Sequence, residues 1–174
     1  MFLLLEKVGV DRFSAIGMSS GGMTLLHMAT SQPGRVAAMV LVSATSHFPD
    51  QARAIMRRAS FDTMPEVVQK MYRECAKRGD TQVRHLITQF NAFSSNYDDM
   101  NFTEQTLSTV AARTLVVHGD RDHFFPVEIP VSIYRSIPNA ELWIIPGGDH
   151  VPIFDSAVPF TSTALRFLDE PNSK

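Results

Sequence analysis

The sequence predicts an α/β fold, in which a parallel sheet is covered by flanking helices. An uninterrupted apolar run at residues 36–42 is typical of a strand that is buried on both faces. Short apolar segments alternate with helical patterns near both ends of the chain. A glycine-rich turn at residues 17–21 separates a strand pattern from a helix pattern. These three observations favour parallel strands joined by right-handed helical crossovers.

Four strands are expected in this sheet, at residues 12–16, 36–42, 114–117 and 141–145. Residues 1–9 have the pattern of a helix that ends just before the first strand. Three other helices are expected around the sheet. One begins near Gly22, and the other two span residues 127–136 and 156–169.

The pattern changes between residues 47 and 110, where no strand is expected. Apolar residues recur at helix spacing and predict helices at residues 51–59, 65–78 and 81–93, followed by a polar loop at residues 91–101. We therefore expect a core made of residues 1–46 and 111–174, with a helical insertion at residues 47–110. Met56, Met71 and Phe90 could line an apolar pocket, since methionine adapts to irregular surfaces. They could equally pack the helices together.

Residues 17–21, with the sequence G-M-S-S-G, match the G-x-S-x-G pattern of a nucleophile elbow. In such an elbow a tight turn between a strand and a helix holds a serine in a strained backbone conformation, and glycines prevent clashes. Ser19 would then project from the sheet edge beside the positive end of the following helix. The backbone N–H of Ser20 would be an oxyanion donor. The alternative is an ordinary serine in a glycine-rich turn.

Two later segments each place polar residues after a predicted strand. The first is H-G-D-R-D at residues 118–122, closed by Pro126, and the second is G-G-D-H at residues 147–150. With the elbow, these motifs resemble the α/β-hydrolase family in the order serine, acid, histidine. The resemblance implies that Asp122 is the acid and His150 the base, with Asp120 as a rival acid that could instead cap the turn.

The resemblance covers nearly the whole chain and implies the C-terminal part of an α/β-hydrolase fold with a helical cap insertion. By this resemblance, we expect the sequence to lack the strands that precede the elbow in the family, together with a loop that supplies the second oxyanion donor. The first strand would then be a bare sheet edge, which can pair with another chain. We therefore expect a homo-oligomer that forms through this edge. The alternatives are assembly with a separate chain that carries the missing strands, or poor solubility.

The resemblance also implies a serine hydrolase that cleaves a small ester, lactone or related acyl substrate through an acyl-enzyme. Met18 and Val151, next to Ser19 and His150 in sequence, are expected in the substrate pocket. A carbon–carbon bond hydrolase, an aminopeptidase or a perhydrolase would use the same triad. The alternative function is that of a truncated, catalytically weak or inactive protein acting as an oligomer or interaction module.

Composition argues against several other classes of partner. A formal net charge of −2 without a Lys/Arg run gives no reason to expect nucleic acid or a membrane surface. The histidines lack ligand spacing and no G-x-G-x-x-G pattern follows the elbow, so neither a metal nor an organic cofactor is expected. Residues 2–5 are too short for a signal-peptide core, and a single cysteine fits a cytoplasmic location. That cysteine, Cys75, is expected to be partly buried in a helix.

Overall fold

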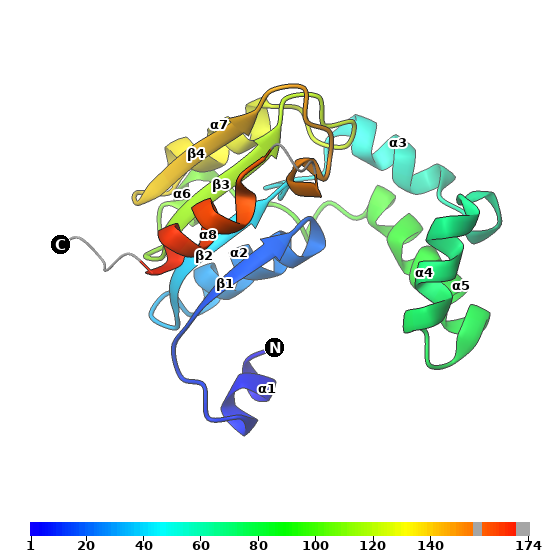
Figure 1. Cartoon of the computed structure of the whole chain (residues 1–174), viewed down its shortest axis with the longest axis horizontal. Helices are drawn as coiled ribbons and strands as arrows, with labels where there is room; N and C mark the ends of the chain where they lie inside the picture. Colours follow the sequence, from blue (N-terminus) through cyan, green and yellow to red (C-terminus); the bar gives the residue numbers. More distant parts are fainter. Residues whose placement is uncertain (155–157, 170–174) are drawn as a thin grey trace. The chain divides into compact units, whose positions relative to one another are not determined.

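The computed structural model describes residues 1–154 and 158–169. The chain divides into two compact units (Figure 1). The first consists of Met1–His47 and Met100–Lys174, and the second of Phe48–Asp99. Residues 100–110, which the sequence analysis placed in the insertion, therefore belong to the first unit.

The first unit contains a four-stranded parallel sheet in the order β1-β2-β3-β4. The strands are β1 (Phe13–Met18), β2 (Val36–Val42), β3 (Arg113–Gly119) and β4 (Ala140–Ile145). The end of β1 pairs with the end of β2, and Gly119 pairs with Ile145. Their carboxyl ends therefore lie along one edge of the sheet. Strands β1 and β3 run two residues further than expected because the parallel pairing continues into the turns.

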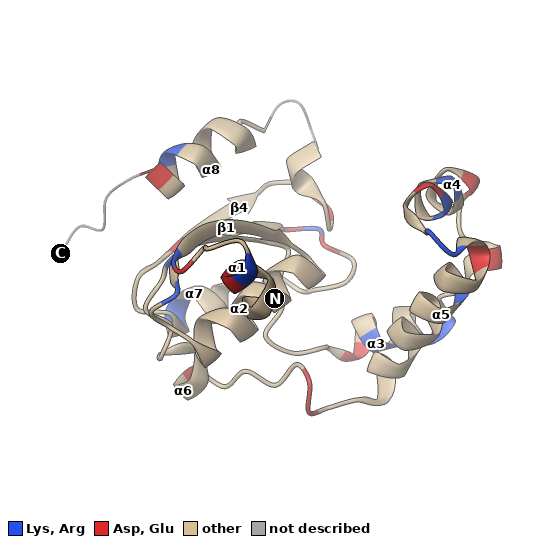
Figure 2. Cartoon of the chain, turned by 90° about the horizontal axis from the view of Figure 1, so that it is seen from below, with Lys and Arg blue, Asp and Glu red and all other residues tan. Residues whose placement is uncertain are grey.

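Helices cover both faces of this sheet, as the fold class predicts. Helices α2 (Ser20–Ser31) and α7 (Glu128–Ser136) lie on one face and α8 (Phe160–Asp169) on the other (Figure 2). Alternate residues of a strand point to opposite faces. Val40, Val117 and Phe167 accordingly belong to one buried cluster. Helix α8 was expected to start at Ser156, a residue that lies outside the described residues. The short helices α1 (Phe2–Lys7) and α6 (Glu104–Leu107) and the 3₁₀ turn η3 (Pro152–Phe154) complete the described helices of the unit.

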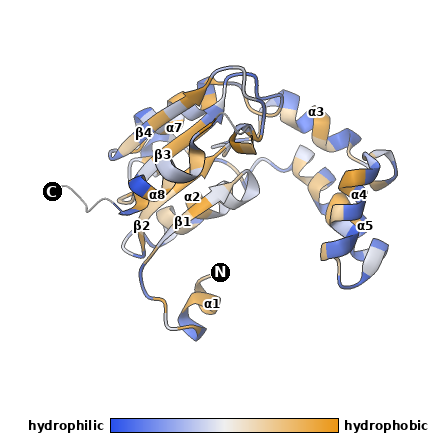
Figure 3. Ribbon diagram, viewed as in Figure 1, coloured by the Kyte–Doolittle hydropathy of each residue, from blue (hydrophilic) through white to orange (hydrophobic). Residues whose placement is uncertain are grey.

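Strand β1 is an edge strand in the described part of the sheet. It pairs with β2, and the side chains of Ile16 and Met18 are 44% and 39% exposed. Helix α1 buries none of its residues, and the orange segments of α1 and β1 in Figure 3 mark hydrophobic residues. An apolar hollow of about 450 Å³ lies between α1, β1 and α2. Pairing of two copies through this edge stays a prediction.

The second unit is entirely helical. Its elements are α3 (Asp50–Arg58), α4 (Glu66–Cys75), α5 (Gly79–Ala92) and two 3₁₀ turns, η1 (Phe61–Thr63) and η2 (Phe93–Ser95). A small core forms from Phe61, Val83 and Ile87. Cys75 is exposed, so its expected partial burial was wrong; α4 buries none of its residues. Among the residues that the structure describes, no helix is long and apolar enough to cross a membrane.

A buried arginine holds the second unit together. The side chain of Arg53 on α3 donates hydrogen bonds to the carbonyl oxygens of Phe48, Phe93, Ser94 and Asn96, at 2.8–3.1 Å. Its guanidinium also lies 3.8 Å from the centre of the Tyr97 ring. Because Arg53 is only 3% exposed, these oxygens replace the water that would otherwise solvate the cation.

We expect Arg53→Met to lower the free energy of unfolding of this unit by about 2–4 kcal/mol, since it leaves buried carbonyls unpaired. Amide hydrogen exchange across α5 would measure the loss of protection. Arg57→Met is the matched control, because Arg57 lies on the same helix and is exposed. Equal protection of α5 in the two variants would contradict the assignment.

Candidate active site

Ser19 lies in the turn between β1 and α2, with φ 50° and ψ −116°. A positive φ is uncommon for a residue other than glycine and is a strained conformation. The turn is held by hydrogen bonds from Ser19 N to the carbonyl of Val42, at 2.7 Å, and from Met23 N to the carbonyl of Ser19, at 3.0 Å. The backbone therefore has the geometry that an elbow requires.

Two glycines permit this close packing of strand and helix. A Cβ on Gly17 would lie 2.5 Å from the carbonyl oxygen of Gly21, and a Cβ on Gly22 would lie 2.7 Å from the Cβ of Ala44. A Cβ on Gly21 would meet nothing within 4 Å. Only glycine therefore fits at Gly17 and Gly22. Gly22 lies outside the G-x-S-x-G motif, so the motif alone does not indicate this second requirement.

Asp122 lies in the turn after β3 and is 7% exposed. Its Oδ1 accepts hydrogen bonds from the backbone N–H groups of Phe124 and Phe125, at 2.7 and 3.0 Å. Its Oδ2 lies 2.8 Å from Nδ1 of His150. Burial by itself raises the pKa of Asp122, but the hydrogen bonds from His150 and the two amides outweigh it, so the pKa is lowered. The carboxylate is therefore ionised at neutral pH.

His150 connects the acid with the serine. A carboxylate only accepts, so Nδ1 of His150 donates to Asp122. Nε2 is then left as an acceptor, 3.0 Å from the Oγ of Ser19. The rings of Phe124 and Phe125 lie 4.6 and 5.3 Å from the imidazole, between ring centres. Three segments that are far apart in sequence thus form one hydrogen-bonded chain at the carboxyl edge of the sheet.

His118, the penultimate residue of β3, is fully buried beneath this chain. Its Nε2 lies 2.9 Å from the carbonyl oxygen of Phe125 and 3.4 Å from Oδ2 of Asp122. Burial lowers the pKa of His118. The neutral imidazole donates to the Phe125 carbonyl and so supports the turn that holds Asp122.

The remaining predicted residues take no part in the hydrogen bonds that connect Ser19, His150 and Asp122. Asp120 is exposed and its Oδ1 accepts a hydrogen bond from Gly147 N at 2.6 Å, not from His150. Ser20 begins α2, where the first backbone N–H groups have no partner within the helix. Met18 and Val151 are adjacent in sequence to Ser19 and His150, and Val151 is half-buried.

The three residues proposed for a pocket in the insertion differ in burial. Met56 is 2% exposed inside the second unit, whereas Met71 is 61% exposed on α4. Phe90 on α5 is half-buried. Their role as a shared pocket lining stays a prediction.

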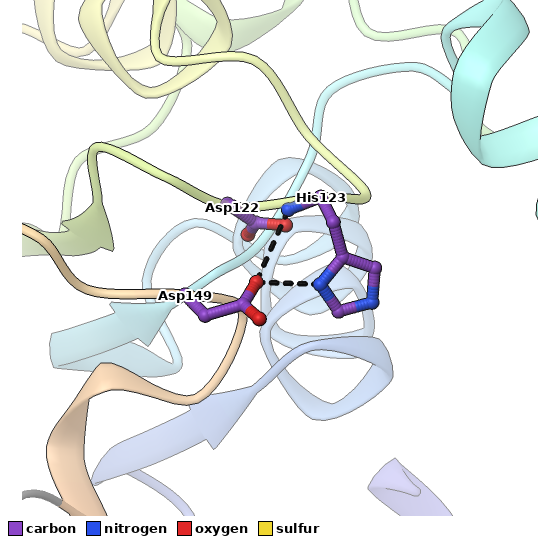
Figure 4. Close-up of side chains that lie close together, drawn as sticks. All are labelled: Asp122, His123 and Asp149. Carbon is purple, nitrogen blue, oxygen red and sulfur yellow. Dashed lines mark hydrogen bonds and ion pairs between the residues drawn. The ribbon is translucent and has the colours of Figure 1, made fainter.

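Sequence reasoning missed a second interaction beside the acid and the base. Asp149 accepts hydrogen bonds from the ring and the backbone of His123 (Figure 4). No motif marks this pair; the only signal is that each residue directly adjoins Asp122 or His150. Ligand atoms of Asp122, His123 and Asp149 lie within 4.8 Å of one another, which is close enough for a metal ion. However, Asp122 already accepts from two amides and His150, so a bound cation would compete with the hydrogen bond to the imidazole.

Comparisons with known proteins agree with this architecture. A solved α/β hydrolase from a Medee basin deep-sea metagenome library superposes with a TM-score of 0.75 at 17% identity, over 99% of this chain and 70% of that one. A family model described as the alpha/beta hydrolase fold matches residues 2–80. The chain has the α/β-hydrolase fold.

Some of the similar proteins have named activities. A 2-hydroxy-6-oxononadienedioate/2-hydroxy-6-oxononatrienedioate hydrolase from Paraburkholderia xenovorans is 22% identical over 95% of this chain and 65% of its own length. The structure of a 2-hydroxy-6-oxo-6-phenylhexa-2,4-dienoate hydrolase from a Rhodococcus species superposes with a TM-score of 0.71 at 18% identity, covering 94% of this chain and 66% of that one. The chain thus spans about 65% of the length of the curated relatives it matches.

Proposed function

We propose that this protein is a serine hydrolase that attacks the acyl carbon of a small ester, lactone or related substrate with Ser19. The observation that carries the proposal is the continuous hydrogen-bonded chain from Ser19 Oγ to His150 Nε2, at 3.0 Å, and from His150 Nδ1 to Asp122 Oδ2, at 2.8 Å. These distances are within the range for a nucleophile and its base. The strained backbone of Ser19 and the α/β-hydrolase fold support the same function.

In the acylation step, Nε2 of His150 takes the proton of Ser19 while Oγ bonds to the carbonyl carbon. The buried, ionised Asp122 holds the imidazole in the required tautomer and stabilises the imidazolium. When the tetrahedral intermediate collapses, the bond to the leaving group breaks and His150 gives its proton to that group. Water, activated by the same histidine, then hydrolyses the acyl-enzyme and restores Ser19.

The Ser20 backbone N–H is the oxyanion donor assigned to this site, since it lies at the N-terminus of α2 directly after the nucleophile. One such donor is typically worth about 10²–10³ in kcat. This amide would therefore stabilise the negative charge that develops on the substrate carbonyl oxygen.

A carbon–carbon bond hydrolase is the second candidate, because the relatives are named as hydrolases of 2-hydroxy-6-oxo dienoate and dienedioate compounds. In this version Ser19 adds to a ketone carbonyl and the adjacent carbon–carbon bond breaks. The electron pair goes to the departing carbon, which takes a proton. Comparison of p-nitrophenyl esters with a 2-hydroxy-6-oxo dienoate distinguishes the two substrate classes.

We expect a fluorophosphonate probe to label the protein at Ser19. Ser19→Ala should abolish the labelling and lower turnover of a responsive ester by about 10⁴-fold or more, because the nucleophile is gone. Ser31→Ala, at the far end of the same helix, is the matched control and should label normally. If the folded protein is not labelled at all, the site is incomplete and the alternative reading of a non-catalytic oligomer or interaction module is favoured.

A further inference from the structure

Two loops carry the acid and the base of the site. The acid loop, residues 120–125, follows β3, and the histidine loop, residues 146–151, follows β4. The hydrogen bond between Asp122 and His150 requires these loops to keep a fixed separation. Misplacement of a catalytic group by about 1 Å can cost 10²-fold in rate.

One carboxylate oxygen of Asp149 forms hydrogen bonds with both loops. Oδ1 of Asp149 accepts a hydrogen bond from His150 N at 2.7 Å, within the histidine loop. The same oxygen accepts from the backbone N–H of His123 at 3.2 Å and lies 2.5 Å from its ring Nδ1, both within the acid loop (Figure 4). The backbone of His150, the base, and His123, the residue after the acid, therefore both bond to Oδ1 of Asp149.

The hydrogen bonds from the two backbone amides to Asp149 contribute more to this connection than the contact between the Asp149 carboxylate and the His123 ring. The side chains of His123 and Asp149 are 54% and 64% exposed, and exposed ion pairs contribute little to stability. Hydrogen bonds to an ionised acceptor are stronger than neutral ones. The hydrogen bond from His123 lowers the pKa of Asp149, so the acceptor is ionised at neutral pH.

The ring of His123 also extends the packing around the base. It lies 4.5 Å from the ring of Phe124, which in turn lies 4.6 Å from the ring of His150. Two further hydrogen bonds join the same loops further from the base. Arg121 N donates to the carbonyl of Gly148 at 2.9 Å, and Gly147 N donates to Oδ1 of Asp120 at 2.6 Å. Asp149 is the side chain that extends the connection to the backbone of His150.

We infer that Asp149, with His123, is a positioning device that holds the His150 imidazole between Asp122 and Ser19. Asp149 is not a catalytic residue, since it acts through the backbone of His150 and the acid loop. The inference rests on the proposed function, because it assigns Asp149 a part in the alignment of that same site.

Steady-state hydrolysis of a responsive ester tests this role in Asp149→Ala, Asp149→Asn and His123→Ala. Asp149→Ala should lower kcat by about 10- to 100-fold with KM nearly unchanged, because the imidazole is misaligned while substrate binding is not altered. Asp149→Asn keeps an oxygen acceptor for the His150 amide and should recover most of the loss. His123→Ala should have a smaller effect than Asp149→Ala. Asp98→Ala, an exposed aspartate elsewhere, is the control.

Proton NMR gives a second readout that does not depend on turnover. A histidine Nδ1–H bonded to a buried carboxylate gives a low-field resonance, and Asp122→Asn identifies the one from His150. This resonance should broaden or vanish in Asp149→Ala and persist in Asp149→Asn. A wild-type protein with the resonance but no ester hydrolysis would contradict the proposed function alone. If Asp149→Ala keeps both kcat and the resonance, or if Asp149→Asn loses as much as Asp149→Ala, the positioning role is overturned.

Discussion

Asp122→Asn is expected to lower kcat by about 10⁴-fold while leaving the fold intact. The asparagine has nearly the same shape, so its oxygen can still accept from the amides of Phe124 and Phe125. Its neutral NH₂ group then faces Nδ1 of His150 and can only donate a hydrogen bond to it. The imidazole then adopts the wrong tautomer, and Nε2 no longer accepts the proton of Ser19. Circular dichroism and kcat measured on the same samples separate this effect from unfolding.

The pH dependence of stability provides an independent check on Asp122. Its pKa in the folded state is lowered, mainly because the hydrogen bonds to His150 and the amides outweigh the effect of burial. A lowered pKa means that the ionised carboxylate stabilises the fold above its unfolded pKa of about 3.9, and that this contribution is lost as the pH falls through the folded pKa. Urea unfolding below about pH 5 should therefore show a shallower acid decline for Asp122→Asn than for the wild type. Asp99→Asn, on an exposed carboxylate, should retain the wild-type decline.

The sheet was predictable from sequence because its signals are local. The apolar run of β2 extends from Val36 to Val42 in both the prediction and the structure. The predicted ends of β1 and β3 fell two residues short, since their last residues pair only when the neighbouring strand is present. Helix α4 shows a different limit: its apolar residues recur at helix spacing, yet Val67 and Met71 are exposed within the second unit. Periodicity identifies an apolar face but not whether anything covers it.

The candidate site could be assembled from sequence only in part. The order of the motifs points to Ser19, Asp122 and His150, and the structure brings their side chains within hydrogen-bonding distance. The choice between Asp120 and Asp122 depends on which side chain is buried in the turn, and this is set by the amides of Phe124 and Phe125. The partnership of Asp149 with His123 spans 26 residues and depends on how closely two strand ends approach. Neither contact has a pattern in the sequence.

Gly119→Ala is expected to be the most disruptive single-methyl substitution at this edge of the sheet. A Cβ at Gly119 would lie 2.2 Å from the carbonyl oxygen of Gly148 and 2.5 Å from that of Asp149. Both neighbours are backbone atoms, so they cannot move aside by a change of rotamer. We expect a loss of about 3 kcal/mol or more in the free energy of unfolding, at the upper end for overpacking.

The same substitution should also affect the chemistry, because the histidine loop can relieve the clash only by moving away from the acid loop. Such a movement would lengthen the 2.8 Å contact between His150 and Asp122, so the variant should lose turnover even at temperatures where it stays folded. Gly34→Ala is the matched control, since a Cβ there meets nothing within 4 Å. Urea unfolding and ester hydrolysis would be measured on both variants. A Gly119→Ala protein as stable and active as Gly34→Ala would show that the two loops are not held in the close contact on which the alignment of His150 depends.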